Sequence, residues 1–260
     1  MIYNYQGISE NRIAPAAAKL SENISGQILV VTSQDNRAKR ITTDLSFFAC
    51  LPVYTMPDVD PAVFRYEVKS RENLNKKLKG LSMLASGCRC IVVLPVLAAL
   101  EKLPDAAQFK KSFLKIKTGD ELERDRLTEA LVNMGYERCS AAEAPGQFAV
   151  RGDIADVFCP EREEPVRIEF FDTEIDSLRS YDPLTQRSTE NIESLEIWPC
   201  SLDLEGSKSP VWDYLAPDSA IFIDDPSRQN ETVDFYLKEN AGNQGGKHTA
   251  EQSPCEEVAA

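Results

Sequence analysis

Histidine is almost absent from this chain of 260 residues, and its single histidine, His248, lies in a polar stretch near the end. Ser-His-Asp and Cys-His catalysis need an imidazole as the base, and histidine-rich metal sites need it as a ligand. Unless His248 folds back onto another part of the chain, these chemistries are excluded. Catalysis by carboxylates alone stays open, although no pair stands out among the 42 acidic residues.

Long apolar runs are lacking too. No run approaches the ~20 residues that cross a membrane, and the first residues, MIYNYQGISENR, lack the basic-then-apolar pattern of a signal peptide. We therefore expect a cytoplasmic protein without membrane contact. The net charge of -13 predicts little direct nucleic-acid binding by the chain as a whole, because phosphate neutralisation supplies most of that affinity. A local basic patch is still compatible with this charge.

Paired cysteine motifs are missing as well. The seven cysteines include no C-x-x-C pair, and their number is odd. This pattern favours buried, reduced thiols over a metal or redox site, which remains the alternative. We predict no bound metal and no cofactor.

The phosphate-binding loop G-x-x-x-x-G-K-S/T is also absent. We expect the first loop, QGISENRI at residues 6–13, to stand where such a loop would lie, but it has no lysine to reach a phosphate. The run AIFIDDP at residues 220–226 is typical of an apolar strand that ends in magnesium-binding acids. A core strand followed by a helix cap at Asp225 is the simpler interpretation. We therefore do not expect this chain to hydrolyse ATP.

The first 110 residues contain a regular alternation. Apolar runs at 26–33, 51–57 and 88–95 are separated by amphipathic segments at 10–23, 35–50 and 70–87. Strands alternating with helices predict an α/β domain with an open parallel sheet and flanking helices. Such sheets often bind nucleotides, so without the lysine loop we expect a degenerate P-loop NTPase-like domain.

The pattern changes after Pro104. The segment from Phe109 to Ser140 predicts a strand, a turn at Gly119, a helix and a helix stop at Gly135. Together with the closing strand NIESLEIWPC, it predicts a small α+β domain with an antiparallel sheet, inserted at residues 111–200. Residues 201–240 then return to the first domain with a strand and helices. Residues 241–260 lack periodicity and predict a disordered tail.

The stretch from Gln147 to Arg187 is the most informative. Within VRIEFF, residues 166–171, alternate side chains point to opposite faces of a strand. Arg167, Glu169 and Phe171 therefore share the face opposite the core. An arginine beside a large aromatic is typical of interface anchors, and an equally weighted alternative is that another element of the same chain covers Phe171.

These residues also carry a family resemblance. The runs PGQFAVRGDIADVF and EPVRIEFFDTEIDSLRSYDPLTQRS closely resemble the second domain of the N-terminal, UvrB-like module of bacterial transcription-repair coupling factors. SENRIAPAAAKL, CIVVLPVLAALEKLP and DYLAPDSAIFIDDPSR are similar to that module's first domain, so the resemblance covers roughly residues 5–240. UvrB itself is disfavoured, because the lysine loop and an aromatic-rich hairpin after Tyr54 are missing.

The resemblance implies a function in nucleotide excision repair. Members of this family recognise stalled RNA polymerase, move it with an ATP-driven motor and recruit UvrA through the second domain of this module. The implied UvrA contacts are Arg151, Arg167 and Phe171, with Glu169, Glu174 and Arg179 in support. RNA polymerase and DNA are then indirect partners, reached through domains that this chain lacks.

Two departures from the family pattern stand out. Asp153 follows Gly152 where the family usually has a second glycine or a small residue, and we expect it to weaken the patch or to pair with Arg151. The chain is also much shorter than the family's proteins, so we expect a truncated copy. The alternatives are a chain that supplies DNA or nucleotide contacts to an ATP-dependent DNA translocase, or one without independent function.

Overall fold

A four-stranded parallel sheet forms the centre of the first domain. The computed structural model describes residues 12–58, 68–202 and 208–245. The sheet has the order β14 (Ala220–Ile223), β1 (Ile28–Thr32), β3 (Ile91–Pro95), β2 (Val53–Thr55), and all neighbours are parallel. Every residue of β1 and β3 is buried, as expected for central strands covered on both faces. The predicted open parallel sheet is confirmed.

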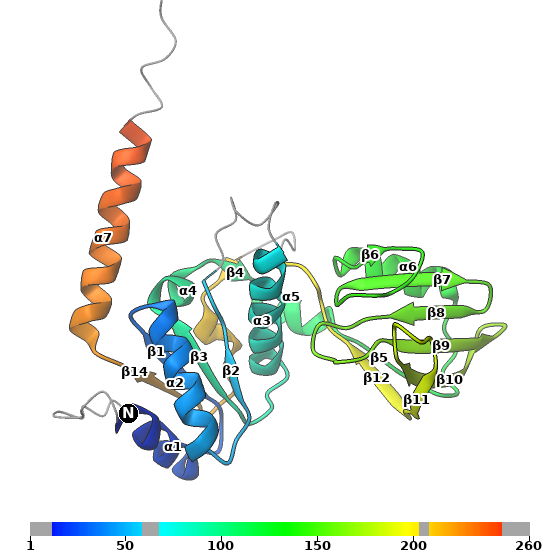
Figure 1. Cartoon of the computed structure of the whole chain (residues 1–260), viewed down its shortest axis with the longest axis horizontal. Helices are drawn as coiled ribbons and strands as arrows, with labels where there is room; N and C mark the ends of the chain where they lie inside the picture. Colours follow the sequence, from blue (N-terminus) through cyan, green and yellow to red (C-terminus); the bar gives the residue numbers. More distant parts are fainter. Residues whose placement is uncertain (1–11, 59–67, 203–207, 246–260) are drawn as a thin grey trace, which may run out of the picture.

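Helices cover both faces of this sheet (Figure 1). Ile28 and Val30 pack with α1 (Ile13–Asn23) and α2 (Asp35–Phe48). The alternate residues Leu29 and Val31 pack with α3 (Val68–Ala85), α4 (Val96–Leu100) and α5 (Ala106–Lys111). The alternation along β1 thus divides the core into two layers.

Helix α5 corrects one prediction. The sequence from Phe109 was expected to be a strand, but residues 106–111 are helical and β5 (Leu114–Lys117) begins only afterwards. The side chain of Asp105 accepts a hydrogen bond from the backbone N–H of Gln108 at 2.9 Å, which caps the helix. The Pro-Asp pair before the apolar residues was the signal for this helix start.

The second domain contains α6 (Arg124–Asn133) and a six-stranded sheet. Its strands, in spatial order, are β11 (Ser188–Asn191), β10 (Glu174–Tyr181), β9 (Val166–Phe171), β8 (Ile154–Val157), β7 (Gln147–Arg151) and β6 (Glu137–Arg138). All pairs are antiparallel except β6 with β7. A separate antiparallel pair joins β5 to β12 (Ser194–Ile197). Leu127 and Leu131 of α6 pack with Phe148 and Ile168 on one face of the large sheet.

The chain then returns to the first sheet. Strand β13 (Lys208–Ser209) pairs with β4 (Leu103–Pro104), and the 3-10 helix η2 (Val211–Tyr214) places Tyr214 in the first core. Strand β14 pairs with β1, with Leu29 opposite Ile221. The first sheet therefore contains strands from both sides of the intervening α+β segment, as the sequence predicted.

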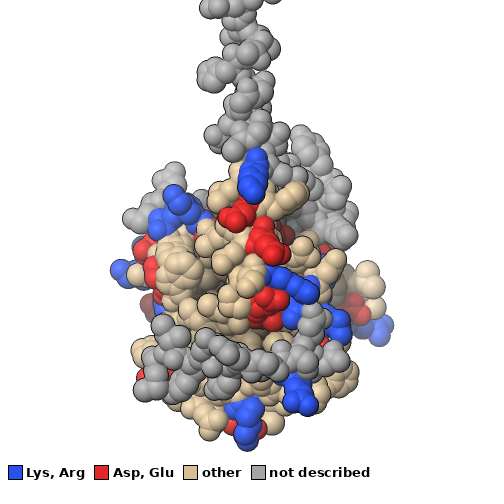
Figure 2. All heavy atoms as spheres, turned by 90° about the vertical axis from the view of Figure 1, so that its left-hand side faces the viewer, with Lys and Arg blue, Asp and Glu red and all other residues tan. Residues whose placement is uncertain are grey.

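Helix α7 (Pro226–Gly245) extends beyond the predicted boundary at residue 240 and stands away from the sheets in Figure 1. Residues 241–245, which the sequence assigned to the disordered tail, belong to α7. The remaining tail, including His248, lies outside the described residues. Figure 2, which faces this side, shows basic and acidic side chains interspersed over the described part of the surface.

The cysteines follow the prediction only in part. Cys90, Cys159 and Cys200 are buried free thiols, but Cys50 and Cys88 are exposed, so burial is wrong for these two. Among the described residues no group of three or more His, Cys, Asp and Glu side chains could hold a metal. No helix in this part of the chain is long and apolar enough to span a membrane.

Candidate functional site

The outer face of the six-stranded sheet carries all six residues that the sequence singled out. Along β9, Val166, Ile168 and Phe170 are buried, whereas Arg167 and Glu169 are half-buried and Phe171 is exposed. The strand registers then add the neighbours on the same face, since directly opposed residues of an antiparallel pair share a face. Arg179 lies opposite Arg167, and Glu174 lies opposite Phe171. Arg151 is on the same face because it lies opposite Ile154, which in turn lies opposite Glu169.

A buried carboxylate lies between two of the arginines. Asp156 is completely buried, although it belongs to the outer face directly opposite Arg167. Arg167 donates from Nε to Oδ1 at 2.8 Å and from Nη2 to Oδ2 at 3.0 Å. Arg151 donates from Nη2 to the same Oδ2 at 2.9 Å. Two positive charges therefore satisfy the one negative charge, which is the condition for burying a carboxylate.

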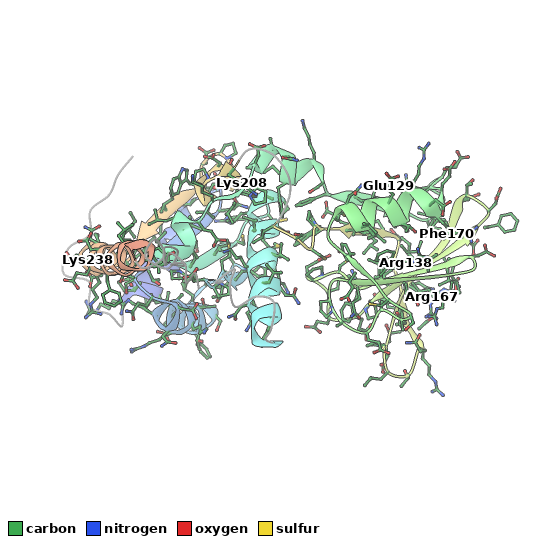
Figure 3. All side chains as sticks on the ribbon, turned by 90° about the horizontal axis from the view of Figure 1, so that it is seen from above. Glu129, Arg138, Arg167, Phe170, Lys208 and Lys238 are labelled. Atoms are coloured by element: carbon green, nitrogen blue, oxygen red, sulfur yellow. The ribbon has the colours of Figure 1, made fainter. Side chains whose placement is uncertain are left out.

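Arg167 is held from several sides. Its guanidinium lies 4.5 Å from the centre of the Tyr181 ring, and Nη2 also donates to Oε1 of Gln186 at 3.1 Å. The hydrogen bonds to Asp156 raise the pKa of Arg167, while burial raises the pKa of Tyr181 to about 12. Figure 3 shows Arg167 on the side of the sheet away from α6, which carries Glu129. Packing and charge thus fix this side chain in one orientation.

A second ion pair lies on the neighbouring strands. Nη2 of Arg179 is 2.9 Å from Oε2 of Glu169, and the same oxygen accepts a hydrogen bond from the Ser177 hydroxyl at 2.5 Å. Both charged side chains are partly exposed, so solvent weakens the pair. The arrangement gives the middle of the face alternating charges.

Phe171 and Glu174 form the end of this face, at the turn between β9 and β10. Asp172 in that turn has φ +59°, a left-handed conformation that Asp tolerates in tight turns. Phe171 is 76% exposed. The alternative that another element buries this ring is therefore wrong within the described part of the chain.

The sequence led us to expect that Asp153 weakens the patch or pairs with Arg151. In the structure Asp153 pairs with a different arginine. Its carboxylate is 2.8 Å from Nη1 of Arg124 at the start of α6, and the same nitrogen donates to the carbonyl of Gly152. Sequence reasoning missed Arg124, Asp156, Tyr181 and Gln186. The one available signal was Asp156 itself, an acid inside the apolar strand IADV.

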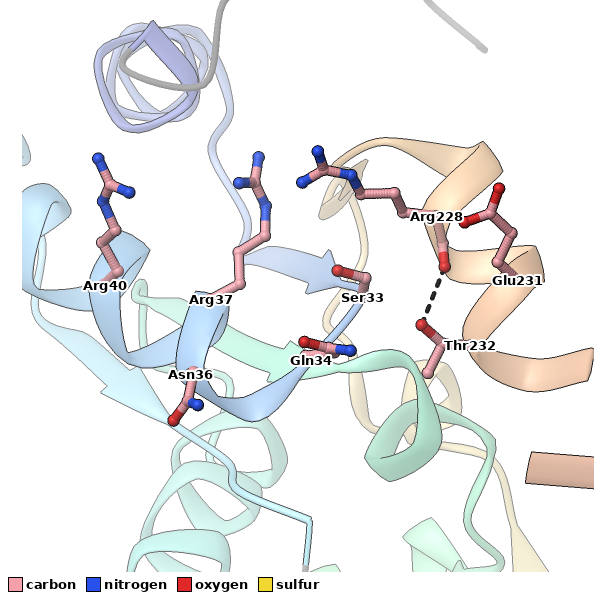
Figure 4. Close-up of a pocket in the computed structure, with 8 residues that line it drawn as sticks. All are labelled: Ser33, Gln34, Asn36, Arg37, Arg40, Arg228, Glu231 and Thr232. Carbon is pink, nitrogen blue, oxygen red and sulfur yellow. Dashed lines mark hydrogen bonds between the residues drawn. The ribbon is translucent and has the colours of Figure 1, made fainter. Parts of the chain in front are cut away.

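The first domain has a separate polar pocket. A cavity of about 500 Å³ lies beyond the ends of β1 and β14, where α2 and α7 begin, and is lined by Ser33, Gln34, Asn36, Arg37, Arg40, Arg228, Glu231 and Thr232. In Figure 4 the side chains of Arg37 and Arg40 extend to the same side of α2, and that of Arg228 extends toward Arg37. Arg37 forms a bidentate ion pair with the buried carboxylate of Asp224, including a bond of 2.9 Å from Nη2 to Oδ1.

This geometry corrects the expected place of the phosphate loop. The loop that follows the first strand and opens a helix is Ser33–Gln34, between β1 and α2. The predicted loop at residues 6–13 precedes this strand, and its first six residues lie outside the described residues. Asp224 directly follows β14, as the magnesium-type motif suggested, but its carboxylate is paired with Arg37.

Comparison with known proteins decides the family of the second domain. Residues 114–202 match the UvrB interaction domain. This segment begins with β5 and contains the whole six-stranded sheet. The resemblance indicated by the sequence motifs is confirmed.

The relatives support the same identification. The transcription-repair-coupling factor of Bacillus subtilis (strain 168) is 35% identical over 194 residues, which cover 74% of this chain and 16% of the relative. That of Staphylococcus aureus (strain bovine RF122 / ET3-1) is 32% identical over 196 residues, covering 75% and 17%. The chain therefore matches an N-terminal part of these factors and spans only about a sixth of their length. The UvrB interaction domain contains all six candidate residues.

Proposed function

We propose that the UvrB interaction domain of this chain is a non-catalytic module that docks UvrA, as part of a transcription-repair coupling factor that links stalled RNA polymerase to nucleotide excision repair. The carrying observation is Phe171, an exposed aromatic ring on a face with three ordered arginines. An apolar ring of this size in water is a cost that binding would remove. RNA polymerase and DNA are indirect partners, reached through other domains of such a factor. These proposed partners support a cytoplasmic location.

Six residues of this face make up the proposed docking patch. Arg151, Arg167 and Phe171 are its centre, and Glu169, Glu174 and Arg179 support it. Arginine suits this role because its planar fork pairs with carboxylates in a fixed geometry. The paired charges on the sheet also imply that UvrA presents charges of both signs.

We infer that the first domain, residues 1–110 with the return segment 201–240, is a degenerate P-loop NTPase-like scaffold. The Ser33–Gln34 loop has no glycine and no lysine to hold a phosphate. Arg37 neutralises Asp224, the acid that would otherwise hold magnesium. The inserted domain at residues 111–200 then carries the function. Purified protein should show no ATP turnover above that of a mock purification, and turnover that persists through rigorous purification contradicts this inference.

The docking proposal is tested by titrating purified UvrA into the chain in a calorimeter. Phe171→Ala and Arg151→Glu should each weaken binding by about 2 kcal/mol or more, the usual effect of truncating an interface anchor. Phe47→Ala and Arg126→Glu are the matched controls, because Phe47 is 80% exposed on α2 and Arg126 lies on α6, away from the face. Unchanged UvrA binding by both test variants contradicts the proposal. Binding by the intact chain also answers whether it functions alone.

A further inference from the structure

The geometry points to Asp156 as the positioning residue of the docking face: we propose that it holds Arg151 toward UvrA, with Arg167 acting through Asp156 and not as a direct contact. This inference rests on the proposed docking function and adds a division of labour among its residues. Asp156 has no exposed surface of its own. It can influence a partner only through the side chains that it orders.

The two arginines differ in what they can offer a partner. The side chain of Arg167 is 16% exposed, and its Nε and Nη2 groups donate to Asp156 and Gln186. One face of its guanidinium is covered by Tyr181. Little of Arg167 is therefore left for recognition.

Arg151 presents the opposite case. Its side chain is 54% exposed, and the structure gives it one hydrogen bond, from Nη2 to Asp156. An arginine has five N–H donors, so most of those on Arg151 face outward. A long side chain loses rotamer freedom when a partner binds it, and the bond to Asp156 removes part of that freedom beforehand.

The β7–β8 turn keeps this pair together. Arg151 lies directly opposite Ile154, two residues before Asp156, so both members of the pair are fixed by one hairpin. Arg167 approaches Asp156 from the next strand, β9. The carboxylate thus lies where two strand pairings meet, and its two oxygens serve both arginines. The chemistry that fits the outward fork of Arg151 is a carboxylate of UvrA, which it would bind through paired hydrogen bonds.

The test is a double-mutant cycle in UvrA binding. Asp156→Asn keeps the side-chain volume but removes the charge, and it should lower the affinity roughly tenfold or more, about as much as Arg151→Ala. The double variant should bind within about twofold of either single variant, because both changes remove the same contact. Asp176→Asn, at an exposed site on β10, is the control for loss of one charge and should bind as the unmodified chain does.

Arg167→Lys is a second variant that tests the same inference. Lysine keeps the positive charge but lacks the planar guanidinium that bonds both oxygens of Asp156. The variant's loss in affinity should also disappear when Arg151 is already alanine. Unchanged affinity of Asp156→Asn, or losses that add in full to that of Arg151→Ala, overturns the inference. A merely structural role would give such additive losses.

A readout without UvrA separates this inference from the docking proposal. The Nε–H of Arg167 donates to a buried carboxylate, so its NMR signal should be protected from exchange in the unmodified chain and lose protection in Asp156→Asn. An unmodified chain that fails to bind UvrA contradicts the docking proposal alone. An Arg167 signal that Asp156→Asn leaves unchanged contradicts the positioning role alone.

Discussion

Asp153 shows how one residue's partner changes the meaning of a sequence departure. Two residues after Arg151 in the sequence, it was expected to weaken the patch or to pair with Arg151. The β7–β8 turn instead directs its carboxylate toward Arg124, while Arg151 pairs with Asp156 on the face itself. The extra acid therefore links the β7–β8 turn to α6 through Arg124. It leaves Arg151 and Arg167 paired with Asp156.

Replacement of Asp153 should accordingly have little effect. Asp153 is largely exposed, and we expect Asp153→Ala to cost at most about 1 kcal/mol in the free energy of unfolding, the usual range for a surface ion pair. UvrA affinity should stay within about twofold in a calorimetric titration. A marked gain in affinity would instead show that the acid opposes Arg151, as the sequence alone had indicated.

At the scale of single residues, the alternation of side chains along a strand predicts much of the docking face. It does not predict Asp156, the buried carboxylate between the arginines. Alternation along one strand is enough to place Arg167, Glu169 and Phe171 together, because it depends only on the period of two. The role of Asp156 depends on the register between β8 and β9, which one strand does not reveal. An acid in an apolar strand is a cost until its cross-strand partners are known.

Among the elements, the long periodic segments were predictable and the short ones were not. Strands β1 and β3 are fully buried, mostly apolar and bounded by helices, so their type and parallel order followed from the pattern. Helix α5 has only six residues, fewer than two turns, and the capping residue before it is its clearest sign. The phosphate-loop position was predicted wrongly, at the first loop of the chain, because such a loop follows the first strand of the sheet and residues 6–13 precede it.

The ion pair of Arg37 and Asp224 joins the first turn of α2 to the residue that follows β14, and its loss should destabilise the first domain. Arg37→Ala leaves the carboxylate of Asp224 buried without its partner, so we expect a cost of roughly 3 kcal/mol in the free energy of unfolding. Chemical denaturation followed by circular dichroism measures it. Lys39→Ala, which removes an exposed pair with Asp35 on the same helix, should cost less than about 1 kcal/mol. Equal costs for both variants would contradict a specific role of the buried pair.

The whole molecule is connected by a chain of aromatic rings. Tyr214 in the first core contacts Phe109, with ring centres 5.5 Å apart, Phe109 contacts Phe113 at 5.7 Å, and Phe113 stacks on Trp198 of the second domain at 5.9 Å. The insertion of the second domain was predictable, because the sequence has strands of the first sheet both before and after the α+β segment. The way the domains meet was not, because it depends on contacts between residues far apart in the sequence, such as Phe113 and Trp198, which are 85 positions apart.

Glu161 makes the stability of the molecule depend on pH. Burial raises the pKa of its carboxyl group to about 7, although Arg162 and Lys79 of α3 act to lower it. Its Oε2 atom is buried without a hydrogen-bond partner in the described part of the chain. Because the folded state holds this proton more tightly than the unfolded state, the contribution of Glu161 is fully present below pH ~4.5 and is lost as the pH rises to about 7.

Glu161→Gln should therefore gain stability relative to the unmodified chain as the pH rises. Glutamine stays neutral, so the difference in unfolding free energy between variant and unmodified chain should increase by roughly 2 kcal/mol from pH 5 to pH 8. Denaturant titrations at both pH values measure this difference. Glu163→Gln, at the exposed neighbouring position, is the matched control and should show no such increase. A constant difference for Glu161→Gln would mean that the carboxylate is already ionised at pH 5, and that Arg162 and Lys79 outweigh its burial.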